Sequence, residues 1–210
     1  MSLTLTSEAL EKYQNASSFQ DLVSLNKEFI DGAINSPYTD GLQPETTPLK
    51  ENLLQLNSLG LLTTNSGSGA GCSKKPKRAY LIGLVEGQAQ AEKLEVLLNQ
   101  SDIIAYKLPC NVPGYKPEEE EKGDGVSVDL LKIPVTFKED SQVGELVVDR
   151  YVTCYNWITL LQPCVQSSIY ETLAKHCYNF YIIDPISNRS ALADDGILNK
   201  VKQALEKLKK

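Results

Sequence analysis

Residues 79–85 form an almost uninterrupted run of apolar side chains, which is typical of a β-strand buried on both faces. Residues 88–99 repeat apolar side chains at helical spacing, and residues 103–106 again have the composition of a strand. This strand–helix–strand order favours an α/β fold. We therefore expect a mixed β-sheet that is flanked by helices.

A second pair of strands is expected in the middle of the chain. Residues 126–137 and 147–155 have strand character and can pair antiparallel across a turn. Two segments rich in Gly, Ser, Pro or charged residues predict flexible loops near residues 66–77 and 111–125. Neither loop looks like a domain boundary, so one α/β domain is expected over residues 1–210.

The C-terminal part predicts two helices around a strand. Ser168 and Glu171 have the spacing of a capping box, which is expected to open the first helix. Residues 178–183 predict a strand. Asp194 or Asp195 is expected to cap the last helix.

The composition is that of an ordinary globular chain, with 41% hydrophobic and 23% charged residues among 210. The formal net charge of −6 argues against a nucleic-acid-binding surface, because phosphate binding needs a positive field. No segment approaches the roughly 20 apolar residues of a membrane helix. We therefore expect neither nucleic acid nor a membrane as a partner, and the sequence leaves the oligomeric state open.

The cysteines indicate the compartment. They number five and show no C-x-x-C spacing, which fits reduced thiols better than a disulfide framework. Residues 1–14 lack the basic start and the long apolar run of a secretory signal. The sequence therefore predicts a soluble, cytoplasmic protein.

The N-terminal part predicts a two-helix segment with an unusual feature. Its amphipathic helices are expected to end at Gly32 and Gly60, and each carries an asparagine on its apolar stripe, Asn26 and Asn57. Buried amides usually bond nearby backbone groups. We expect both asparagines to be buried and to face the turns around Pro37 and Gly60.

Separated short motifs in residues 19–66 resemble those of a family of small uncharacterised proteins, mostly bacterial. The matching residues are Asp31-Gly32, Pro37-Tyr38, Glu45-Thr46, Leu56-Asn57, Gly60, Thr63 and Ser66. The family has no assigned activity, so the resemblance implies a shared fold and site more than a reaction. The chain departs from the pattern after Ser66, where Gly67-Ser68 stands in place of Gln-Pro.

The candidate ligand-binding site lies at the end of a strand expected at residues 61–65. Open α/β sheets bind ligands where strands end, and glycines after this strand would let backbone approach a bound group. The residues expected to line one concavity there are Tyr38, Glu45, Thr63, Asn65 and Ser66. The cofactor is unknown, and no metal is expected because the Cys and His spacings fit no metal site.

Three functions are compatible with these residues. The first is a protein that binds a small polar ligand or a protein partner near residues 61–66. The second is a hydrolase or group transferase that uses the same polar cluster. The third is a structural or assembly protein without a ligand. Binding leads because no nucleophile–base pair is visible.

Individual candidates for chemistry have plain structural alternatives. His176, the single histidine, follows Lys175 near an expected helix end, where its charge suits the helix dipole. Glu45 and then Asp31 are the carboxylates of most interest, although capping and solvent exposure explain such residues equally well. The glycine-rich segment 67–71 lacks the Gly-Lys-Ser/Thr ending of a phosphate-binding loop.

Overall fold

The computed structural model describes residues 5–39, 41–69, 78–110, 130–141, 144–155 and 157–209, and for residues 130–155 it describes the backbone alone. The α-helices are α1 (Ser7–Asn15), α2 (Phe19–Asp31), α3 (Lys50–Ser58), α4 (Gln88–Asn99), α5 (Ser167–His176) and α6 (Ile197–Leu208). Two 3₁₀ helices are η1 (Thr47–Leu49) and η2 (Trp157–Leu161). The strands are β1 (Leu62–Ser68), β2 (Ala79–Glu86), β3 (Ile104–Pro109), β4 (Leu130–Ser141), β5 (Gly144–Tyr155) and β6 (Cys177–Ile183).

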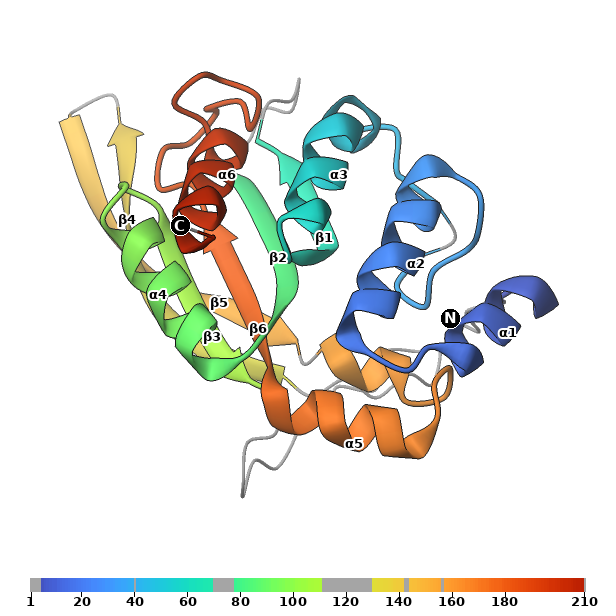
Figure 1. Cartoon of the computed structure of the whole chain (residues 1–210). Coiled ribbons are helices and arrows are strands. Elements are labelled where there is room, and N and C mark those ends of the chain that lie inside the picture. Colours follow the sequence, from blue (N-terminus) through green and yellow to red (C-terminus); the bar gives the residue numbers. More distant parts are fainter. Residues whose placement is uncertain are drawn as a thin grey trace.

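The main sheet has four strands in the order β1-β2-β6-β3 (Figure 1). Every neighbouring pair is antiparallel, so the α/β class is confirmed but the expected mixed pairing is wrong. Strands β2 and β3 run in the same direction, as a strand–helix–strand unit requires. They are not neighbours because β6, from the far end of the chain, lies between them.

Strands β4 and β5 form a separate antiparallel hairpin, which confirms the predicted pairing. Their register runs from Leu130 opposite Tyr155 to Ser141 opposite Gly144, so the pairing reaches into the segment expected to be a turn. The other predicted loops fall mainly outside the described residues: 111–125 lies there entirely, whereas 66–68 belong to β1.

Helices α3, α4 and α6 cover one face of the sheet (Figure 1). The alternation of side chains along β2 and β6 explains this face: Leu81 pairs with Ile182, and Gly83 pairs with Phe180. Leu81, Ile182 and Phe180 are fully buried. The amphipathic stripe of α6 packs here through buried Val201, among others. Helix α2 lies beside α3 and reaches the edge strand β1.

The N-terminal helix ends follow the sequence closely. The Ser18 hydroxyl accepts from the backbone N–H of Asp21 at 3.1 Å and caps α2. Gly32 and Gly60 adopt φ of 87° and 101°, the left-handed conformation that ends a helix. Pro48 lies in the first turn of η1, directly ahead of α3.

The two C-terminal caps differ from the prediction. Helix α5 starts after Gln166 without a side-chain cap, so the capping box of Ser168 is wrong. Helix α6 starts after Gly196, also without one. Asp195 instead accepts from Arg189 at 2.9 Å, because a nearby guanidinium is a stronger partner than backbone N–H groups.

Arg189 also secures the segment between β6 and α6. Its Nε and Nη2 donate to the two carboxylate oxygens of Asp184 at 2.6 Å each. Asp184 is fully buried, and the Arg189 side chain is 10% exposed. Asp184 Oδ1 accepts in addition from the backbone N–H of Ile186 at 2.9 Å. This buried ion pair therefore fixes the loop that follows the sheet.

Candidate functional site

The candidate site is built on β1, an edge strand of the sheet. Its pairing with β2 shifts register between Thr63 and Asn65, which leaves Thr64 as the extra residue of a β-bulge. The strand continues to Ser68. The expectation that it ends at residue 65 is therefore wrong, and the site lies along the strand instead of beyond it.

Asn26 and Asn57 hold the start of this strand. Asn26 Nδ2 donates to Asn57 Oδ1 and to the Thr63 carbonyl, both at 2.9 Å. Asn57 Nδ2 donates to the Thr63 hydroxyl and to the Leu53 carbonyl at 2.8 Å, and the Thr63 N–H donates to Asn57 Oδ1 at 3.3 Å. Both asparagines are 1% exposed, so their predicted burial is confirmed. Their partners are in β1 and α3, however, and not in the turns around Pro37 and Gly60.

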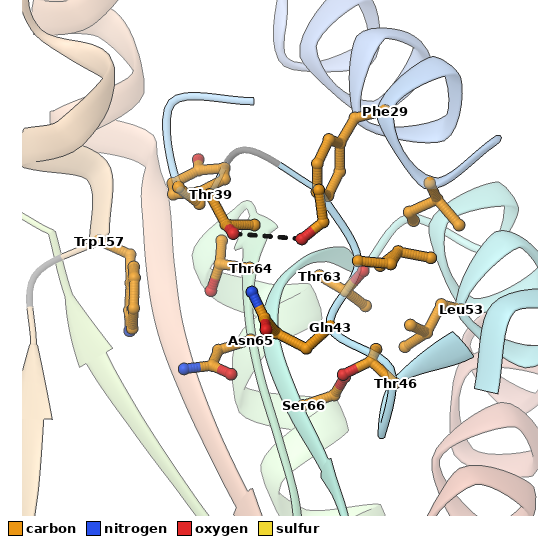
Figure 2. A pocket seen from close by; sticks show the side chains of 14 residues that line it. Phe29, Thr39, Gln43, Thr46, Leu53, Thr63, Thr64, Asn65, Ser66 and Trp157 are labelled. Atoms are coloured by element: carbon orange, nitrogen blue, oxygen red, sulfur yellow. Dashed lines mark hydrogen bonds between the residues drawn. The ribbon is translucent and has the colours of Figure 1, made fainter. Parts of the chain in front are cut away.

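A pocket of about 260 Å³ lies next to this network (Figure 2). Helices α2 and α3 supply its apolar floor through Phe29, Ile30 and Leu53. The remaining walls come from the segment after α2, from β1 and from η2; they consist of Tyr38, Thr39, Gly41, Leu42, Gln43, Thr46, Thr63, Thr64, Asn65, Ser66 and Trp157. The pocket thus joins segments more than a hundred residues apart in sequence.

Hydroxyl, amide and aromatic groups supply the polar chemistry of the pocket. Among the described lining residues there is no Lys, Arg, His, Asp, Glu or Cys. The described lining side chains, the Tyr38 phenol included, therefore keep one protonation state at physiological pH. The described lining residues can donate and accept hydrogen bonds, and none of them carries a charge or forms an acid–base pair.

Two hydroxyl groups in the pocket wall stand out. The Tyr38 Oη and Thr64 Oγ1 atoms are buried and have no hydrogen-bond partner among the described residues. Burial raises the pKa of the Tyr38 phenol well above its usual value, so it stays a donor. The Tyr38 ring meets Trp157 edge-on, with centroids 6.1 Å apart and planes inclined by 70°. Buried polar groups are normally satisfied, so these two hydroxyls are exceptions among the described residues of the pocket.

The structure brings together four of the five predicted site residues. Tyr38, Thr63, Asn65 and Ser66 line the pocket. Glu45 does not line it; its side chain is exposed, while its neighbour Thr46 does line the pocket.

Glu45 interacts electrostatically with Tyr80, which bonds the pocket residue Asn65. Burial first, and the negative charge of Glu45 second, raise the pKa of the Tyr80 phenol. Tyr80 Oη donates to Asn65 Oδ1 at 3.3 Å. The Tyr80 ring lies over Gly67, where an added Cβ would meet the ring at 2.3 Å. Gly67 therefore leaves the space in which the Tyr80 ring packs.

Sequence reasoning missed Trp157 and Gln43 as residues that line the pocket. Trp157 is the single tryptophan of the chain. Its backbone N–H donates to Asn179 Oδ1 of β6 at 3.2 Å, which fixes η2 against the sheet. Its rarity was the one available signal. Thr64 was visible as part of a polar run, but nothing in that run marked the bulge.

The other candidates for chemistry lie elsewhere. Asp31 pairs with Lys50 at 3.0 Å and joins the ends of α2 and α3. His176 is exposed at the end of α5. Cys110, Cys164 and Cys177 are buried thiols that form no disulfide with one another, and burial raises the pKa of each. Within the described ranges, His, Cys, Asp and Glu form no group that could hold a metal ion.

A family model described as a domain of unknown function (DUF6919) matches residues 8–208, and the chain belongs to that family. No curated protein matches the chain. In the part of the chain that the structure describes, none of the helices is both long and apolar enough to cross a membrane.

Proposed function

We propose that this member of a family of unknown function is a binding protein for a small polar ligand, held in the pocket along β1. The observation that carries the proposal is the pair of buried hydroxyls, Tyr38 Oη and Thr64 Oγ1, which lack a partner among the described residues. Leaving such groups unsatisfied costs about 1–3 kcal/mol each. A ligand that bonds both would recover that free energy.

Several of the resemblance motifs point to the same pocket. Tyr38 and Thr46 belong to them and line it, as do Thr63 and Ser66. The motif residue Asn57 holds Thr63 in place. We take this pattern to mark a site shared by the family. In this chain, Tyr80 occupies the space that a side chain at residue 67 would need, which accounts for the departure after Ser66.

The pocket favours binding over the alternative of a hydrolase or group transferase. Hydrolysis and group transfer generally need an activated nucleophile or a general base. The described lining residues include no carboxylate, imidazole, amine or thiol. A cytoplasmic location is part of the proposal, and it is supported by three buried cysteines that form no disulfide with one another.

Thermal-shift screening tests this function. Neutral polar compounds should include some that raise the unfolding temperature of the wild type, because a ligand at 100 times its dissociation constant stabilises by about 2.7 kcal/mol. The variant Tyr38→Phe keeps the ring against Trp157 and removes the hydroxyl, so it should lose most of the shift. A screen without any stabilising compound, or equal shifts in wild type and variant, would contradict the proposal.

A further inference from the structure

Trp157 gives the pocket one flat wall. Figure 2 shows its indole edge-on, across the pocket from Thr64 and Asn65. Tyr38 meets Trp157 edge-on and does not stack on it. One face of the indole is therefore turned towards the pocket, opposite the bulge of β1. A flat ring fits against this wall better than a puckered ring does, because a flat ring can stack over the indole face.

The lack of charged side chains among the described lining residues restricts the class of ligand further. An ion that entered this pocket would lose water without meeting an opposite charge among the described lining residues, and that desolvation is costly. The described lining therefore fits a neutral ligand better than an ion. The volume of about 260 Å³ is below the range of roughly 300–1,000 Å³ usual for ligand pockets, so one or two fused rings would fill it.

Two amides stand at the rim and can read the edge of such a ring. Asn65 and Gln43 line the pocket and are both exposed. A carboxamide presents one acceptor and one donor side by side, which matches the donor–acceptor edge of a nucleobase. Tyr80 donates to Asn65 Oδ1 and thereby orients the Asn65 amide, with Nδ2 left to donate. Tyr80 is a positioning residue for Asn65.

From this geometry we infer that the ligand is an uncharged, planar nitrogen heterocycle of the nucleobase class, stacked on Trp157 and hydrogen-bonded at its edge by Asn65. The inference rests on the proposed function and narrows its ligand class. The Thr64 hydroxyl on the opposite wall faces the plane of such a ring, so it can bond only a substituent that leaves that plane.

The fluorescence of Trp157 provides the test, because it is the single tryptophan and lines the pocket. The full chain is titrated with adenine and uracil, with glucose and myo-inositol, and with orotate, the carboxylated form of uracil. We expect saturable quenching by at least one base. Orotate should bind at least about tenfold more weakly than uracil, because its charge enters without a counter-charge.

A matched pair of variants checks the role of the amide. Asn65→Ala should weaken binding of the base about tenfold or more, as expected for one bidentate contact. Asn15→Ala removes an exposed asparagine in α1 and should leave binding unchanged. Tyr80→Phe should weaken binding less than Asn65→Ala, since it releases the amide without removing it.

The outcomes separate the inference from the proposed function. Saturation by glucose or myo-inositol alone would overturn the heterocycle and leave the binding function standing. Binding of a base that Asn65→Ala does not weaken would also overturn the inference, because the edge contact defines the class. No saturable signal with any of the five probes would contradict the heterocycle, and the thermal-shift screen then decides on the binding function separately.

Discussion

Asn26 and Asn57 are bonded to each other, with Asn26 Nδ2 2.9 Å from Asn57 Oδ1, and together they hold Thr63 of the edge strand β1. A side-chain amide also bonds the opposite edge strand, β3. The Asn99 side chain of α4 donates to the Ala105 carbonyl and accepts a hydrogen bond from the Ala105 N–H. Side-chain amides thus occupy backbone groups at both sheet edges, which limits unwanted strand pairing there. The asparagine network therefore holds the site in place and does not itself recognise the ligand.

The first prediction concerns this support. Asn57→Ala should lower the free energy of unfolding by about 1–3 kcal/mol, because buried groups of Thr63 lose their partner. The free energy is measured by urea denaturation. The exposed Asn15→Ala serves as the control and should change it by less than about 0.5 kcal/mol.

A double-mutant cycle with Asn26→Ala sharpens this prediction. Because the two amides share Thr63, their coupling should lie between about 0.5 and 3 kcal/mol. Purely additive losses would show that the two asparagines act separately, and the network would lose its claimed role.

The second prediction concerns the buried ion pair. Arg189→Ala leaves the carboxylate of Asp184 buried without its bidentate partner, which should destabilise the fold by about 3–5 kcal/mol. The solvent-screened pair of Lys12 and Glu28 is the comparison, and Lys12→Ala should destabilise the fold far less than Arg189→Ala does. Equal losses in the two variants would mean that burial of Asp184 does not govern the result.

The third prediction follows from the thiols. Burial first, and the charge of Glu86 second, raise the pKa of Cys177 to about 12 from a usual 9.0. Between these values the unfolded chain releases a proton that the folded chain keeps, so stability falls as pH rises from about 9 to about 12. Below pH 9 both states hold the proton and the effect is absent.

Urea denaturation at a series of alkaline pH values measures this dependence. The raised pKa of Tyr38 and of Cys110 acts in the same direction. Cys177→Ala should flatten the decline. Stability that stays constant up to pH 11, on the order of two units above the usual thiol pKa, would refute the burial of these groups.

The fourth prediction is that no disulfide contributes to stability. The described cysteines Cys110, Cys164 and Cys177 are buried and form no disulfide with one another. Unfolding midpoints with and without reductant should agree within error. A thiol reagent should label these three positions, mapped by peptide mass spectrometry, only after unfolding. A clear drop of the midpoint on reduction would overturn both this prediction and the cytoplasmic proposal.

Local features of the fold could be predicted because local sequence determines them. Gly32 and Gly60 end their helices through a backbone conformation that glycine favours. The burial of Asn26 and Asn57 followed from the apolar stripes around them. The position of β6 between β2 and β3 could not be predicted, since strand order depends on contacts about a hundred residues apart in sequence.

For the site too, residues positioned by local sequence could be predicted, and residues positioned by tertiary contacts could not. Tyr38, Thr63 and Ser66 lie in one stretch whose helix ends constrain the chain, so their convergence could be foreseen. Trp157 lies in η2, and its backbone N–H donates to Asn179 of β6. This tertiary contact has no local signal in the sequence. Glu45 fell outside the pocket because the side chain of Thr46 turns inwards in its place.

The adjacent threonines of the bulge test the central claim most directly. Thr63 bonds Asn57 through its hydroxyl, whereas the buried hydroxyl of Thr64 has no partner among the described residues. The measurement is the free energy of unfolding, without ligand, of Thr63→Val and Thr64→Val. A hydroxyl reserved for a ligand predicts a loss of about 1–3 kcal/mol for Thr63→Val and no loss, or a gain, for Thr64→Val. A comparable loss for Thr64→Val would show that its hydroxyl serves the fold, and would contradict the binding site proposed for this pocket.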